Sequence, residues 1–233
     1  MTFVLIPGAW LGEWCWRGVT RRLGDVGLTS IAVTLPGLGE RAHLLKPDIG
    51  LDAHVSDVVS LLREKDLRNV VLVGHSYGGT VITAVAAQMP ELVRCLIYLD
   101  GSVPQDGQSN NDVLGSERAG RIRAAAHDWG EGWRVPPPAL SDWALPHTIK
   151  AWAWRKLTPH PLRSLEDPVR LRPAAAARIG RAFLRSSTQS PLYGGLMERA
   201  RAAGWRCADV PGGHYAMLTA PDAVAAALCA LVR

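Results

Sequence analysis

The residues best suited to chemistry lie at positions 74–79, which read GHSYGG. This is a G-x-S-x-G motif, in which a serine stands on a sharp turn between a strand and a helix with its hydroxyl exposed. Glycines flank the serine because side chains would collide in so tight a turn. Residues 69–73 are typical of a buried strand, and the small apolar residues 80–88 of a buried helix. The motif therefore predicts Ser76 as a nucleophile, with a purely structural glycine turn as the alternative.

A serine hydroxyl is a weak nucleophile until a base removes its proton. Of the seven histidines, His214 fits this role best because it follows a strand expected at 205–210, on a Pro-Gly-Gly loop. A structural loop role is the alternative for His214. His75 adjoins the serine, which favours a structural role for it. A surface or other polar role is the default for the remaining histidines, which are His43, His54, His127, His147 and His160.

A third residue should hold the tautomer of the histidine, and a carboxylate does this. Asp100 ends the strand expected after the motif and lies between Ser76 and His214, which gives the chain order nucleophile, acid, histidine. The competing position follows the next strand, but residues 186–190 contain only Ser, Thr and Gln. Asp100 is therefore predicted as the acid, and the alternative is a site with no functional acid.

Negative charge that develops on a substrate oxygen requires donors held in place beforehand. The backbone N–H of Tyr77, next to the nucleophile, is the first donor expected. The second is expected from the loop after the strand at 2–6, most simply the N–H of Ala9. Gly8 would let this loop pass close to the nucleophile, although Pro7-Gly8 could also be a simple turn that ends the strand.

These residues can meet only if the fold brings several loops to one edge of a sheet. Strands are predicted at 2–6, 30–34, 69–73, 93–99, about 178–185 and 205–210, and helices at 14–26, 51–65, 80–88, 192–203 and 221–232. Such alternation predicts an α/β fold, with a mostly parallel sheet of about six strands and helices on both faces. Sites in such sheets collect at the carboxyl ends of the strands, where Ser76 and Asp100 would lie.

Residues 104–175 break this rhythm. They hold a polar run, three consecutive prolines at 136–138 and five of the nine tryptophans, at 129, 133, 143, 152 and 154. The segment is too long for an ordinary loop and too aromatic for a disordered linker. It is predicted to be an inserted, mostly helical cap, which divides the core into residues 1–103 and 176–233. The residues predicted to contact substrate are Trp10, Trp129, Trp133 and Trp152, and other tryptophans should form the core of the cap.

The composition of the chain argues against several classes of protein. The chain has 233 residues, of which 48% are hydrophobic, enough for one large domain. Its apolar runs are far shorter than the ~18 residues of a membrane span, and its first residues look like a strand rather than a basic leader. The four cysteines form no C-x-x-C pair, so no metal is expected. The net charge of +5 is scattered, which argues against nucleic acid. A cytoplasmic protein is expected, either monomer or homodimer.

Three segments resemble the α/β-hydrolases, and more narrowly the group of plant methyl-ester esterases, hydroxynitrile lyases and their bacterial esterase relatives. They are residues 3–10 (FVLIPGAW), 72–79 (LVGHSYGG) and 213–218 (GHYAML), and the similarity extends over nearly the whole chain. The resemblance implies the α/β-hydrolase fold with an inserted cap, and it strengthens the assignment of Ser76 and His214.

Three departures from this group stand out. The group usually has His-Gly where this chain has Pro7-Gly8, and its acid usually follows the strand that ends near Arg185. The hydroxynitrile lyases use a threonine and a lysine at the positions of Gly8 and Tyr215. Cleavage of cyanohydrins is therefore disfavoured.

The sequence predicts hydrolysis of a small-to-medium apolar carboxylic ester or lactone through an acyl-enzyme on Ser76, with no cofactor. One alternative is a lyase or cyclase that acts on a biosynthetic intermediate, since proton transfer by Ser76 and His214 needs no acyl-enzyme. A second alternative is a non-catalytic ligand-binding protein with a hydrolase fold.

Overall fold

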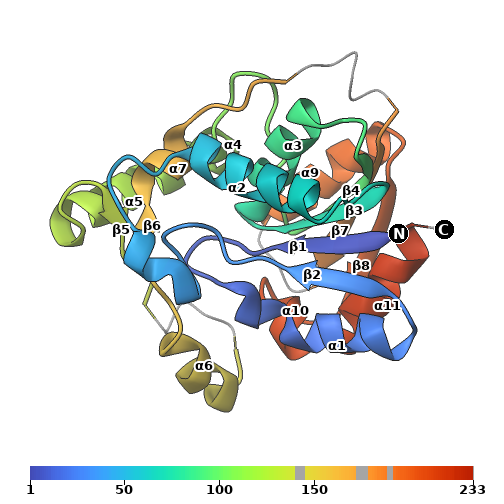
Figure 1. The fold of residues 1–233 in the computed structure, drawn as a ribbon. Coiled ribbons are helices and arrows are strands. Elements are labelled where there is room, and N and C mark those ends of the chain that lie inside the picture. Colours follow the sequence, from blue (N-terminus) through green and yellow to red (C-terminus); the bar gives the residue numbers. More distant parts are fainter. Residues whose placement is uncertain (140–144, 172–177, 188–190, 233) are drawn as a thin grey trace.

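The computed structural model describes residues 1–139, 145–171, 178–187 and 191–232, and its centre is a six-stranded sheet (Figure 1). In the order β2-β1-β3-β4-β7-β8, neighbouring strands all pair in parallel. The strands are β1 (Thr2–Ile6), β2 (Thr29–Ala32), β3 (Val70–His75), β4 (Val93–Leu99), β7 (Gly180–Ser186) and β8 (Arg206–Val210). The parallel α/β sheet predicted from the sequence is confirmed.

Helices cover both faces of the sheet (Figure 1). Side chains alternate along each strand, so Val4 and Ile6 of β1 pack on one face while Phe3 and Leu5 pack on the other. The first face is covered by α2 (Leu51–Glu64), α3 (Gly78–Gln88) and α9 (Pro191–Ala202). The second is covered by a 3-10 turn η1 (Glu13–Trp16), by α1 (Arg17–Asp25), α10 (Ala216–Thr219) and α11 (Pro221–Leu231). A second 3-10 segment, η2 (Gly39–Leu44), follows β2. The sheet is thus packed between two hydrophobic clusters, one on each face, which hold its strands in place.

The chain between β4 and β7 lies beyond the carboxyl ends of the strands (Figure 1). Its described parts are α4 (Asn110–Leu114), α5 (Ser116–Trp129), β5 (Arg134–Val135), α6 (His147–Trp154), β6 (His160–Pro161) and α7 (Leu162–Glu166). β5 and β6 form a separate antiparallel pair, and none of these described parts joins the main sheet. The end of the predicted cap and Trp143 lie outside the described residues, so the division at 104–175 stays a prediction.

Among the helices that the structure describes, none combines the length and the apolar character needed to cross a bilayer.

The turn from β3 into α3 is pressed against the end of β1. A Cβ atom at Gly78 would lie 2.6 Å from the carbonyl oxygen of Ile6 and 2.8 Å from that of Pro7. Real Cβ contacts are not that short, and both obstacles are backbone atoms that cannot rotate away. Glycine at 78 therefore lets helix α3 begin directly beside the loop that follows β1.

Gly78→Ala should lower the free energy of unfolding by about 1–3 kcal/mol, the usual cost of overpacking a close-packed site. Gly120→Ala is the matched control, because an added Cβ in α5 would meet nothing within 4 Å. It should be neutral or stabilise by about 0.5–1 kcal/mol, as alanine does in a helix. Urea unfolding measures both values, and equal changes would show that the contact with β1 is not tight.

Candidate active site

Ser76 lies where β3 ends and α3 begins, with a backbone φ of 52°. A positive φ is unfavourable for a residue with a side chain and persists only where the surroundings impose it. Here the Ser76 N–H donates to the carbonyl of Leu99 at 3.3 Å, and the Ser76 carbonyl accepts from Gly79 at 3.0 Å and Ser102 at 2.9 Å. These bonds hold the strained turn, and Ser76 lines a cavity.

His214 and Asp100 meet beside this turn. The Nδ1 atom of His214 lies 3.5 Å from Oδ2 of Asp100, and it has no closer hydrogen-bond partner among the described residues. Asp100 is fully buried, and Ser186 donates its backbone N–H to Oδ1 at 3.0 Å and its hydroxyl to Oδ2. A carboxylate there favours the tautomer with a proton on Nδ1, which leaves Nε2 of His214 free to accept one.

The position of Asp100 follows from the sheet topology. β4 and β7 are neighbours, with Leu99 opposite Leu184, so Asp100 and Ser186 leave adjacent strands side by side. Ser186 belongs to the segment where the resemblance places the usual acid, and here it supplies hydrogen bonds to a carboxylate that follows β4. Residues 188–190 of that segment lie outside the described residues.

His75 connects the nucleophile turn to the loop of His214. It is buried, and its Nε2 donates to the backbone carbonyl of His214 at 2.7 Å. Burial, followed by the nearby His214, lowers the pKa of His75 well below its usual value, so His75 is neutral. A Cβ atom at Gly8 would lie 2.8 Å from Nδ1 of His75 and 2.9 Å from Cβ of Ser76. Glycine at 8 thus brings the loop after β1 against the nucleophile, in spite of the proline at position 7.

Tyr77 points away from Ser76 into a buried polar chain that runs into the segment between β4 and β7. Its hydroxyl lies 2.8 Å from Nδ1 of His54, and its ring packs edge-on against His160 at 4.8 Å between centroids. Nε2 of His54 donates to the carbonyl of Pro36 at 3.0 Å, so Nδ1 must accept the proton of the Tyr77 hydroxyl. Burial lowers the pKa of His54 to about 4, which keeps this ring neutral.

His160 extends the same chain to the loop after β1. Its Nε2 lies 2.8 Å from the hydroxyl of Ser164, and its Nδ1 lies 3.5 Å from the N–H of Trp10. Burial lowers the pKa of His160 well below its usual value. No particular role was predicted for His54 and His160. Their positions in the sequence and the residues beside them do not indicate that two histidines so far apart in the chain meet in the core.

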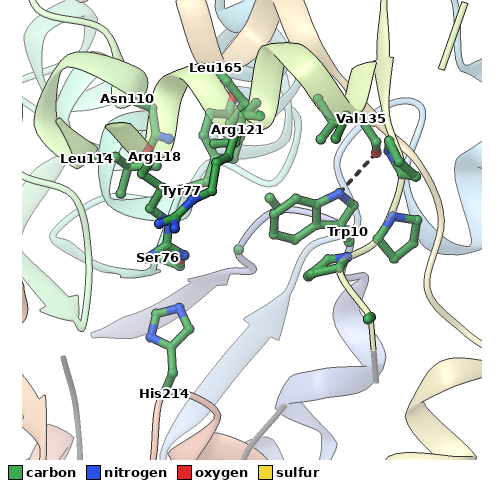
Figure 2. Close-up of a pocket in the computed structure, with 18 of the residues that line it drawn as sticks. Trp10, Ser76, Tyr77, Asn110, Leu114, Arg118, Arg121, Val135, Leu165 and His214 are labelled. Atoms are coloured by element: carbon green, nitrogen blue, oxygen red, sulfur yellow. Dashed lines mark hydrogen bonds between the residues drawn. The ribbon is translucent and has the colours of Figure 1, made fainter. Parts of the chain in front are cut away.

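The cavity in front of Ser76 has a volume of about 830 Å³. Its walls include Ala9, Trp10 and Tyr77 on the side of the core and α5 on the opposite side (Figure 2). Trp10 has a φ of 67° and donates its indole N–H to the carbonyl of Val135 at 3.0 Å. Trp129 stands at the mouth with 80% of its surface exposed. The structure therefore brings Trp10 and Trp129 to the cavity, as expected.

Trp133 and Trp152, which were expected to contact substrate, lie elsewhere. Trp152 packs edge-on against Trp14 at 5.2 Å between ring centroids and lines a separate hollow beside α1. Trp133 lies under the guanidinium of Arg134, 5.6 Å from its ring centroid, and is not among the cavity residues. Both expectations are corrected, because composition alone does not show which way a tryptophan of a short segment faces.

Two features of the site were missed from the sequence. Tyr193 of α9 stacks on the ring of His214 at 4.9 Å and an angle of 14°, and its hydroxyl lies 3.5 Å from Nε2 of His214. Burial raises the pKa of Tyr193 to about 12, so the phenol stays protonated. Arg118 and Arg121 of α5 also line the cavity. No motif marks these residues, since they come from elements that only the fold brings to Ser76.

Residues 3–227 match the model of the alpha/beta hydrolase family. The chain belongs to this family. A carbendazim hydrolyzing esterase of Nocardioides sp. (strain SG-4G) is 33% identical to this hydrolase over 245 aligned positions, which cover 98% of each chain. A pFDCC methylesterase of Arabidopsis thaliana is 26% identical and covers 87% of the hydrolase and 82% of its own length. The resemblance found in the sequence is thus confirmed.

The solved structures agree on the fold of this hydrolase. An extracellular alpha/beta-hydrolase from a Paenibacillus species superposes with a TM-score of 0.89 at 22% identity, over 99% of this chain and 98% of its own. Tomato methylketone synthase I, in its H243A variant, superposes with a TM-score of 0.83 at 19% identity, over 100% and 96%. At these identities the likeness concerns the fold alone.

Asp100→Asn should slow the labelling of Ser76 by a fluorophosphonate by about 10³–10⁴-fold, since the amide would favour the wrong tautomer of His214. Ser186→Ala is the matched control. It removes a hydroxyl bonded to the same carboxylate but keeps the charge and the backbone N–H bond, so a loss below about tenfold is expected. Labelling rates followed by intact mass compare the two, and an unaffected Asp100→Asn variant would exclude Asp100 from the site.

The stacked ring of Tyr193, rather than its hydroxyl, should hold the imidazole in place. Tyr193→Phe keeps the ring and should change the labelling rate by no more than about threefold. Tyr193→Ala removes the ring and should slow labelling by about tenfold or more, the scale of an aromatic pair. If Tyr193→Phe slowed labelling as much as Tyr193→Ala, the effect would be assigned to the hydroxyl instead.

Proposed function

We propose that this hydrolase cleaves a small-to-medium carboxylic ester through an acyl-enzyme on Ser76. The observation that carries the proposal is the meeting of three groups at one cavity: the strained Ser76, the ring of His214 and the buried carboxylate of Asp100. The relatives named as esterases and methylesterases support the same reaction class.

His214 acts first as a base and then as an acid. Its Nε2 takes the hydroxyl proton of Ser76 while the oxygen attacks the ester carbonyl, and Asp100 stabilises the imidazolium that forms. The tetrahedral intermediate then expels the alcohol, which leaves with the proton from His214. Water attacks the acyl-serine by the reverse use of His214, which releases the acid and restores Ser76.

The oxyanion is held by the N–H groups of Ala9 and Tyr77. Both residues line the cavity, and within the described part of the chain neither N–H is used in another hydrogen bond. The next N–H along the loop, that of Trp10, is instead directed to His160. Because Gly8 is packed against Ser76, this loop lies as near to the nucleophile as an oxyanion hole requires.

The apolar part of the ester or lactone binds in the cavity against Trp10, Ile122, Val135 and Leu165. A volume of about 830 Å³ suits a small organic molecule. A cytoplasmic location belongs to the proposal, and Cys15, Cys95 and Cys207 support it because thiols outside disulfides are usual in reducing compartments.

Ser76→Ala should reduce the hydrolysis of p-nitrophenyl butyrate by about 10⁴–10⁶-fold, because the nucleophile of the triad is lost. The unaltered protein should show a burst of nitrophenol and an added butyryl mass on the peptide that contains Ser76. Mass spectrometry of the quenched reaction detects this intermediate. Turnover without an acyl-serine, or with Ser76→Ala at full rate, would reject the proposal and favour a lyase or cyclase that uses only proton transfer.

A further inference from the structure

One wall of the cavity is cationic, which a purely apolar substrate does not explain. α5 directs Arg118, Arg121, Ile122, Ala125 and Trp129 into the cavity. These positions are spaced by three and four residues, so they form one face of the helix. Arg118 is partly buried on this face, whereas Arg121 is 71% exposed and only borders the cavity.

We infer that the ester cleaved at Ser76 carries a carboxylate, and that Arg118 binds this carboxylate. The inference rests on the proposed function and specifies its substrate class: an ester with an apolar body and one acidic group.

Arg118 is close to the reacting groups. Figure 2 shows the Arg118 side chain descending from α5 on the side of the cavity that holds Ser76, with Trp10 across from it. Burial raises the pKa of Tyr193, and the charge of Arg118 opposes that shift, so the guanidinium acts on the phenol that stacks on His214. A carboxylate bound by Arg118 would thus lie within a few bonds of the scissile carbonyl.

The charge of Arg118 is not matched within the described part of the protein. On the same helix Arg121 pairs with Glu117 at 3.2 Å and Arg123 pairs with Glu166 of α7. Arg118 forms no ion pair with a described carboxylate, and no described Asp or Glu lines the cavity. Asp100 is fully buried behind His214 and bonded to Ser186. The counter-charge must therefore arrive with the ligand.

The free-energy cost of removing water from the Arg118 guanidinium supports the same conclusion. Arg118 is half-buried, and an apolar ligand in the cavity would remove more water from its guanidinium without replacing the lost hydrogen bonds. A carboxylate would replace them with two charge-assisted hydrogen bonds in the planar geometry that guanidinium favours. The opposite wall, with Trp10 and Val135, remains for the apolar part (Figure 2).

The test compares the monomethyl ester with the dimethyl ester of each dicarboxylic acid from succinic to suberic acid. For each acid, the ratio of kcat/KM for the monoester to that for the diester measures recognition of the carboxylate. In the unaltered protein this ratio should peak at one chain length, set by the reach from Ser76 to Arg118. Arg118→Gln should lower the peak ratio by about 10- to 100-fold, and Arg118→Lys should recover part of it.

Arg123→Gln is the control, because it removes the same charge from the same helix at a position that does not line the cavity. It should leave the ratio unchanged. A ratio that is unaffected by Arg118→Gln, or lowered equally by Arg123→Gln, would overturn the inference, the second result indicating long-range attraction only. Failure of the proposed function is distinguishable, since it would abolish turnover of the neutral diester and the acyl-serine as well.

Discussion

The catalytic arrangement depends on how closely three backbone segments approach one another at Ser76. The end of β1 touches the turn at Gly78, the loop after β1 touches Ser76 through Gly8, and the loop after β4 donates its Ser102 N–H to the Ser76 carbonyl. These contacts involve backbone or Cβ atoms, so they leave no room for adjustment by rotamers. The nucleophile, the oxyanion loop and the acid loop are therefore placed relative to one another by the sheet itself.

The acid shows how a fold can keep its geometry when a residue changes strand. β4 and β7 lie side by side, and the ends of both strands face the His214 loop. A carboxylate from either strand can reach the same imidazole. Here the carboxylate near the imidazole is that of Asp100 on β4, and Ser186 of β7 donates two hydrogen bonds to it.

The fold, and the meeting of Ser76, His214 and Asp100 near one cavity, could be predicted from the sequence because each has a local cause. Strand and helix alternate in the sequence, the G-x-S-x-G turn is continuous, and Asp100 follows from chain order once residues 186–190 are seen to lack an acid. The features that were not predicted depend on contacts between segments that are distant in the sequence. The facing of Trp133 and Trp152, the burial of His54 and His160, and the stacking of Tyr193 on His214 are set by packing, which one sequence does not display.

The buried polar chain also has a bearing on how a ligand reaches Ser76. Through His160, the segment between β4 and β7 packs against the ring of Tyr77 and accepts the backbone N–H of Trp10. Swinging that segment away would take from Nδ1 of the buried, neutral His160 the N–H of Trp10, and a buried polar atom is costly to leave unsatisfied. We therefore expect a ligand to enter the cavity by rotation of exposed side chains at its mouth, above all Trp129. The backbone of the segment between β4 and β7 should stay in place.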